Sequence, residues 1–319
     1  MIVPPFASPS PGVGGVGRSF PPRRRVLVTV PRAEHPPRLP LPGLSRWWSA
    51  LIVAIFGIGC AVLRTPEASR LPSKHTVRRE MLRIRSDAEV ADDDPRILEL
   101  YALRDEVRLM LHLPEQRRPV TVYLFRDELR YTKFMESRYP NLPARRAFFI
   151  GTPVELAVYA YWGEQVREDL RHEYTHGLLH ASLQQVPLWL DEGLAEYFEV
   201  PRLAPGRVNT DHADGLAEML LNGWKPDLKR LERLDDVSEM QRADYQESWA
   251  WIHFLLNESD ASRDVLFSYL GELESPVSPP PFASQLAREM PRAEDRLIAY
   301  IASTLDTGVA RVTISAATE

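Results

Sequence analysis

The sequence of 319 residues contains a single cysteine, Cys60, and this scarcity excludes two ways of stabilising a fold. One thiol cannot form an intramolecular disulfide framework, and it cannot supply the thiolates of a cysteine-rich structural zinc site. A basic excess is also missing, because 39 Lys and Arg residues face 44 Asp and Glu residues and leave a net charge of −5. This balance argues against nucleic acid as the main partner.

Long apolar runs are absent from most of the chain, and the exception is residues 47–63, which carry no charge between Arg46 and Arg64. This length is at the short limit for crossing a bilayer and is long for the core of a signal peptide. Residues 1–46 are rich in proline and arginine, a composition that predicts a disordered tail. The sequence therefore predicts a tail, an apolar segment at the membrane and a folded part from residue 70 to residue 319.

Two interpretations of the apolar segment stay open. It is an uncleaved signal anchor, or it is a bacterial lipoprotein signal in which Cys60 is lipidated after the small residues of Gly57-Ile58-Gly59. The arginines that precede it favour an N-terminus left in the cytoplasm. Both interpretations predict membrane attachment in the cell envelope, with the folded part outside the cytoplasm.

The folded part has the composition of a globular domain, with 44% hydrophobic and 26% charged residues in the whole chain. Apolar patterns predict a strand or a short helix at 76–86 and strands at 119–125, 147–150 and 155–162. They predict helices at 94–111, 127–137, 164–183, 188–200, 214–221, 245–256, 262–273 and 282–305. The expected fold class is α+β: a small mixed α/β N-terminal lobe, then a helical C-terminal lobe, with a cleft where they meet.

Residues 172–176 read His-Glu-Tyr-Thr-His inside a predicted helix. Positions four apart lie on one face of a helix, so His172 and His176 can direct their imidazoles at one metal ion. Glu173 is rotated by about 100° on the helix period, which places it beside the ion as a general base for a water molecule. A surface helix with two solvated histidines is the simpler alternative.

Catalytic zinc usually takes three protein ligands, so a third residue is needed. The next predicted helix carries Asp191-Glu192-Gly193-Leu194-Ala195-Glu196, and a return of the chain after residues 184–187 brings Glu192 towards His176. Glu196, one turn further on, is expected to accept the free ring N–H of a ligating histidine, as carboxylates behind metal ligands do.

These two segments, HEYTHGLLH and VPLWLDEGLAEYFE, resemble the gluzincin clan of zinc peptidases, and most closely the peptidase-MA-like domain of bacterial envelope proteins. The resemblance covers about residues 120–256 and implies a zincin-like fold that binds one zinc ion. It implies His172, His176 and Glu192 as ligands and Glu173 as general base. The clan's aminopeptidases also have a tyrosine that stabilises an oxyanion, and Tyr245 lies at a comparable distance, although a tyrosine that only packs is an equal alternative.

The chain lacks the Gly-x-Met-Glu-Asn strand with which those aminopeptidases bind a substrate amine. We therefore expect a zinc endopeptidase that acts on peptides or proteins, and the strand at 155–162 is a candidate for pairing with an extended substrate. A zincin-fold module that binds zinc but cleaves nothing is the alternative function.

Overall fold

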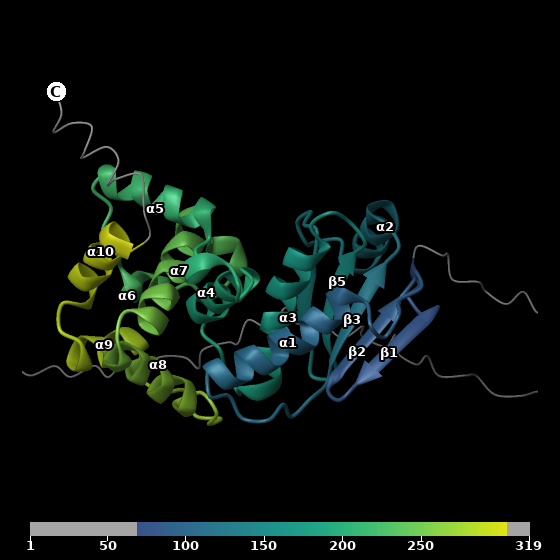
Figure 1. The fold of residues 1–319 in the computed structure, drawn as a ribbon, viewed down its shortest axis with the longest axis horizontal. Coiled ribbons are helices and arrows are strands. Elements are labelled where there is room, and N and C mark those ends of the chain that lie inside the picture. The colour runs from purple at the N-terminus through teal and green to yellow at the C-terminus, as the bar shows by residue number, and fades with distance from the viewer. Residues whose placement is uncertain (1–68, 305–319) are drawn as a thin grey trace, which may run out of the picture.

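The computed structural model describes residues 69–304, which form two lobes lying side by side (Figure 1). The N-terminal lobe contains a five-stranded sheet of order β1-β2-β3-β5-β4, in which the outer pairs are antiparallel and the inner pairs are parallel. The strands are β1 (His75–Arg79), β2 (Leu82–Ser86), β3 (Val120–Phe125), β4 (Phe148–Gly151) and β5 (Leu156–Tyr161). Strand β4 is therefore an edge of the sheet.

Strand β3 is buried along its whole length because both faces of the sheet are covered. Val122 and Leu124 contribute to the main hydrophobic core, whereas Tyr123 and Phe125 contribute to a second, aromatic core on the opposite face. Helix α3 (Val166–Ser182) packs on the first face, and α2 (Glu128–Arg138) packs on the second. A continuous apolar sequence is what a doubly covered strand requires.

Helices α1 and α2 begin at aspartates, where the sequence predicted helix starts. Asp94 accepts a hydrogen bond from the backbone N–H of Arg96 at the start of α1 (Pro95–Met110), and Asp127 caps α2 through the N–H of Arg130. Such caps satisfy backbone donors that have no partner within the helix. Helix α1 packs against α3.

The C-terminal lobe is helical, as expected, and α7 (Arg242–Asn257) lies at its centre, where the side chains of Trp249, Trp251 and Phe254 are fully buried. Helix α7 contacts α4, α5, α8 and α10. The other helices of this lobe are α4 (Leu188–Glu199), α5 (Thr210–Leu221), α6 (Leu228–Leu231), α8 (Asp260–Glu272), α9 (Phe282–Glu289) and α10 (Ala293–Thr304). The α+β class with two lobes is thus confirmed.

Two glycines allow α3 and α4 to approach their neighbours closely. A Cβ atom on Gly177 would lie 2.8 Å from the Val120 side chain, and one on Gly193 would lie 2.6 Å from the carbonyl oxygen of Ser248. Both glycines belong to the sequence motifs, and they hold α3 against the sheet and α4 against α7. The two motif helices are therefore fixed to different lobes while they also pack on each other.

Three predictions about elements were wrong in detail. Residues 76–86 form a hairpin of two strands, with Glu80 at a positive φ of 52° in the turn, instead of one element. The predicted helix 282–305 is two helices, because Pro291 has no N–H to continue α9 and Arg292 has a φ of 63°. Strand β5 lies between β3 and β4, so the edge open to an extended peptide is β4.

The predictions for residues 1–46 and 47–63 lie outside the described part of the chain and stay predictions. Within residues 69–304, no helix has both the length and the apolar character needed to cross a membrane.

Candidate metal centre

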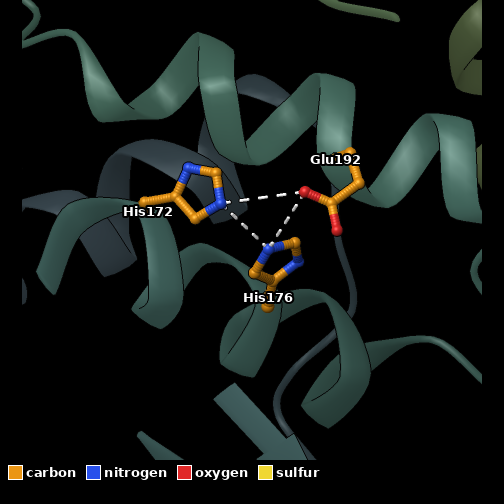
Figure 2. A group of neighbouring side chains, drawn as sticks. All are labelled: His172, His176 and Glu192. Carbon is orange, nitrogen blue, oxygen red and sulfur yellow. Dashed lines mark hydrogen bonds and ion pairs between the residues drawn. The ribbon is translucent and has the colours of Figure 1, made fainter. Parts of the chain in front are cut away.

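His172 and His176 lie one turn apart on α3, and their rings face the same space (Figure 2). The two Nε2 atoms are 3.3 Å apart. Helix α4 packs across α3 and brings Glu192 to the same point, where its Oε2 atom is 3.8 Å from each Nε2 atom. The structure therefore brings together the three residues predicted as ligands.

Each histidine places its other ring nitrogen next to a carboxylate. His172 Nδ1 lies 3.0 Å from Glu199 Oε2, and His176 Nδ1 lies 2.8 Å from Asp191 Oδ1. Carboxylates accept hydrogen bonds, so both contacts favour the tautomer that carries its proton on Nδ1. In that tautomer both Nε2 lone pairs point at the space that they share with Glu192.

Three electron-rich atoms thus face one another in a buried place. Glu192 is 5% exposed and His176 is 6% exposed, and Glu192 Oε2 has no hydrogen-bond partner. Buried polar atoms normally have a partner, and leaving one without costs free energy. A cation or a proton between these atoms removes the mutual repulsion.

The pKa shifts of the three residues indicate that the site favours positive charge. Burial opposes protonation of His172, yet its hydrogen bond with Glu199 and the nearby charge of Glu196 raise its pKa well above the ordinary value. Burial likewise opposes protonation of His176, but Asp191 and Glu192 raise its pKa to about 9. Burial raises the pKa of the Glu192 carboxyl. All three shifts favour added positive charge at the cluster.

The spacing of the three atoms fits a tetrahedral zinc ion. Zinc–ligand distances near 2.0–2.2 Å place the ligand atoms of such a site roughly 3.3–3.6 Å apart, close to the observed separations of 3.3 and 3.8 Å. His172, Glu196 and Glu199 form a second possible group. Its carboxylates already have histidine partners, so the group that includes Glu192 fits an ion better.

Glu196 differs from its predicted role. Its Oε2 atom contacts His212 Nε2 at 2.8 Å, on the N-terminal turn of α5, instead of a ring nitrogen of a predicted ligand. Glu199 and Asp191 occupy the positions behind the histidines. Glu199 comes seven residues after Glu192, which is two helical turns on the same face, and this spacing was the signal that sequence reasoning missed.

Asp191 connects His176 to a further histidine. Its second oxygen, Oδ2, contacts His180 Nε2 at 2.8 Å, and the ring of Phe149 on β4 stacks on both histidine rings. Burial would raise the pKa of Asp191, but the two imidazoles hold it well below its usual range. Asp191 therefore stays ionised and fixes the ring orientation of His176, while His180 fixes Asp191 in turn.

Arg171 joins α3 to the end of α4 and so positions Glu199. The Arg171 side chain is 5% exposed and donates hydrogen bonds to the carbonyl oxygens of Phe198 and Glu199, at 2.7 and 2.9 Å. These are terminal carbonyls that have no helical partner. A cation at the C-terminus of a helix is also favoured by the helix dipole.

Of the remaining predicted residues, Glu173 lines a pocket of about 340 Å³ together with His172, Glu199 and the neighbouring Arg145. Glu173 is half-buried there and has no hydrogen bond or ion pair among the described residues. On the helical lobe, the Tyr245 hydroxyl accepts a hydrogen bond from Arg145 at 3.3 Å. Burial and the charge of Glu192 raise the pKa of Tyr245, so its hydroxyl is protonated at neutral pH.

A comparison with family models finds similarity over residues 168–279 to a family described as "Protein of unknown function (DUF1570)". The matched region is about a third of the chain and includes α3 from its first turn, α4 and α7, and hence every residue of the cluster. No curated protein matches the chain.

Proposed function

We propose that the chain is a zinc-dependent endopeptidase of the gluzincin type, in which His172, His176 and Glu192 hold one zinc ion. The observation that carries this proposal is the convergence of three electron-rich atoms, from the buried His176 and Glu192 and the partly buried His172, at separations of 3.3 and 3.8 Å. The contacts of Glu199 and Asp191 with the far ring nitrogens support it, because carboxylates behind metal-binding histidines orient the rings and raise their basicity.

When bound, zinc would lower the pKa of a water molecule and polarise a peptide carbonyl. Glu173 lines the same pocket without a competing partner, so it is available to accept a proton from the attacking water and to pass it to the leaving amine. The protonated hydroxyl of Tyr245 is a donor for the oxyanion that develops on the substrate. Glu173 lines the pocket, and Tyr245 contacts Arg145, which also lines it.

The edge strand β4 supports a peptide as the substrate. Its outer edge has no strand partner among the described residues, and Phe149 on this strand packs on His176 and His180. An extended peptide that adds to this edge would lie next to the candidate metal centre. Because the sequence lacks the aminopeptidase strand that binds a free amine, cleavage within a chain is the preferred reaction. The proposal keeps the enzyme in the cell envelope, attached through residues 47–63.

Metal analysis of the purified full-length chain tests the binding half of the proposal. We expect close to one zinc ion per chain after dialysis against zinc-free buffer, and loss of that ion in the double variant H172A/H176A. A wild-type chain without near-stoichiometric zinc contradicts the proposed function.

Comparison of wild type with Glu173→Gln on a panel of peptides and unfolded proteins tests the catalytic half. The variant keeps the volume of the side chain and removes the base, so we expect zinc content to stay and cleavage to fall by about 10²–10⁴-fold. If neither protein cleaves any substrate while both hold zinc, the chain is a zinc-binding module of the same fold.

A further inference from the structure

Two consecutive arginines on the loop between α2 and β4 have different partners. Arg146 donates to Asp169 at 2.9 Å and to Glu168 at 3.5 Å, so its charge is compensated on the surface of α3. Arg145 has no ion pair within the described residues, and its one hydrogen bond goes to the Tyr245 hydroxyl. Both arginines line the pocket of the candidate metal centre. The pocket therefore contains one cationic group without a carboxylate partner.

The guanidinium of Arg145 has N–H donors that bind no other described residue. An arginine has five N–H groups in a planar fork, and one of those of Arg145 is used by Tyr245. The fork matches the two oxygens of a carboxylate, with which arginine forms paired, charge-assisted hydrogen bonds. A lysine or a neutral donor would not offer this geometry.

Arg145 is also held next to the candidate metal centre. It belongs to the N-terminal lobe, whereas Tyr245 lies in the first turn of α7 in the helical lobe, so their hydrogen bond joins the two lobes. The negative charges of Glu192 and Glu173 interact with the guanidinium from the side of the metal centre. A ligand that binds Arg145 is therefore next to Glu173 and to the predicted ligands.

We propose that Arg145 binds a carboxylate of the peptide substrate close to the bond that is cleaved. The carboxylate belongs either to the side chain of an acidic residue, which keeps cleavage within a chain, or to the free C-terminus of a peptide, which would make the enzyme a carboxypeptidase instead. This inference rests on the proposed function and adds to it a substrate class, peptides that carry a negative charge near the scissile bond. Arg145 is the residue that determines this specificity.

Binding of short peptide hydroxamates to the zinc-loaded full-length chain, measured by calorimetry, tests the inference without requiring turnover. Hydroxamates bind zinc, and the peptides come in two pairs. One pair differs only in a C-terminal carboxylate or carboxamide, and the other, amidated, differs only in an Asp or Asn side chain. We expect wild type to bind the acidic member of one pair about 10–100-fold more tightly, as expected for charge-assisted hydrogen bonds. The pair that shows the preference identifies the source of the carboxylate.

Variants connect the preference to one side chain. In Arg145→Gln the preference should fall below about twofold, whereas Arg145→Lys should retain part of it, because the charge stays and the fork is lost. Arg146→Gln on the same loop is the matched control and should keep the full preference, since Arg146 is paired with Asp169. Thermal unfolding of each variant checks that the fold is intact.

Two results would overturn the assignment. One is equal binding of both members of both pairs by zinc-loaded wild type, which leaves the proposed metal centre untouched. The other is an equal loss of preference in Arg146→Gln and Arg145→Gln, which would indicate a general electrostatic field. A chain that takes up no zinc at all refutes the proposed function at the preceding metal analysis, and this inference falls with it.

Discussion

Two buried polar clusters begin at neighbouring residues of α3, Arg171 and His172, and they are built in opposite ways. In the Arg171 cluster each cation meets an anion or a carbonyl: Arg171 contacts Glu99 at 3.2 Å, and Arg207 contacts Glu106 at 2.8 Å. In the His172 cluster three atoms that can each accept a hydrogen bond or bind a metal, two ring nitrogens and one carboxylate oxygen, face one another. Buried groups that are fully paired stabilise a fold, whereas unpaired ones mark a place for a ligand.

The Arg171 cluster should respond to mutation through stability. Arg171→Leu leaves Glu99 with only the exposed Arg167 as a partner, removes one of the two buried cations next to Glu106, and uncovers the carbonyls at the end of α4. We expect a loss of about 3–5 kcal/mol in the free energy of unfolding, the usual cost of breaking a buried pair. Urea unfolding of the metal-free chain measures it. Arg167→Leu is the control, because Arg167 pairs with the same Glu99 from an exposed position and should cost less than about 1 kcal/mol. Equal losses in the two variants would remove the contrast.

The His172 cluster should respond through metal affinity instead. In Glu192→Gln one predicted ligand is lost. The variant should lose part of the roughly 10–16 kcal/mol of binding free energy that is typical of zinc sites, and we expect a zinc affinity that is about 10²–10³-fold weaker. The metal-free chain should be at least as stable as wild type, since burial disfavours the charge that is removed. Chelator competition and thermal unfolding measure the two quantities. A similar loss of affinity in Glu196→Gln, with Glu192→Gln unaffected, would place the ion in the group of His172, Glu196 and Glu199.

The contacts behind the ligands should have a smaller effect. Asp191→Asn removes the charge next to His176 Nδ1, and the zinc affinity should fall by about 10–100-fold. His180→Gln acts one contact further away and should lower it less. His212→Gln is the control, because His212 contacts Glu196 and none of the three predicted ligands. The expected order of chelator competition constants is therefore Asp191→Asn, His180→Gln and then His212→Gln, and any reversal contradicts the chain of contacts.

The last prediction concerns the pH dependence of metal-free stability and of zinc affinity at the His172 cluster. The pKa of His176 is raised to about 9 in the metal-free fold, above the ordinary value of 6.5. Its contribution to metal-free stability is thus fully present below about pH 6.5 and is lost as the pH rises towards 9. Zinc must displace this proton, so zinc affinity should increase by up to about tenfold per pH unit between pH 7 and 9. Calorimetry in buffers of different ionisation enthalpy should detect proton release at pH 7, and its absence would show that both His172 and His176 are already neutral.

Much of the fold and the centre of the site could be predicted because the signals are local. The placement of His172 and His176 on one face depends only on the helix period. Asp94 and Asp127 indicate the starts of the helices that they cap. Burial on both faces of β3 followed from its apolar sequence. The position of Glu192 could be predicted because the turn between α3 and α4 is short.

The remaining features depend on contacts between elements that are distant in the sequence, and no periodic pattern indicates such contacts. Glu196 and Glu199 lie one turn apart on α4, and the packing of α5 decides that the first contacts His212 while the second contacts His172. Arg145 and Tyr245 are a hundred residues apart and meet only because the lobes do. The order of the strands likewise comes from long-range pairing, which is why β4 and not β5 is the edge.

For the proposed endopeptidase, the shortness of β4 has a consequence for which proteins it could cut. The strand is four residues long, from Phe148 to Gly151, and Pro153 follows closely with no N–H to extend the pairing. A substrate held along this edge needs only a brief extended stretch, so an exposed loop or a loose tail of an otherwise intact neighbour would suffice. Such an enzyme would trim and nick native proteins at their accessible segments, and it would not need a partner that unfolds them first.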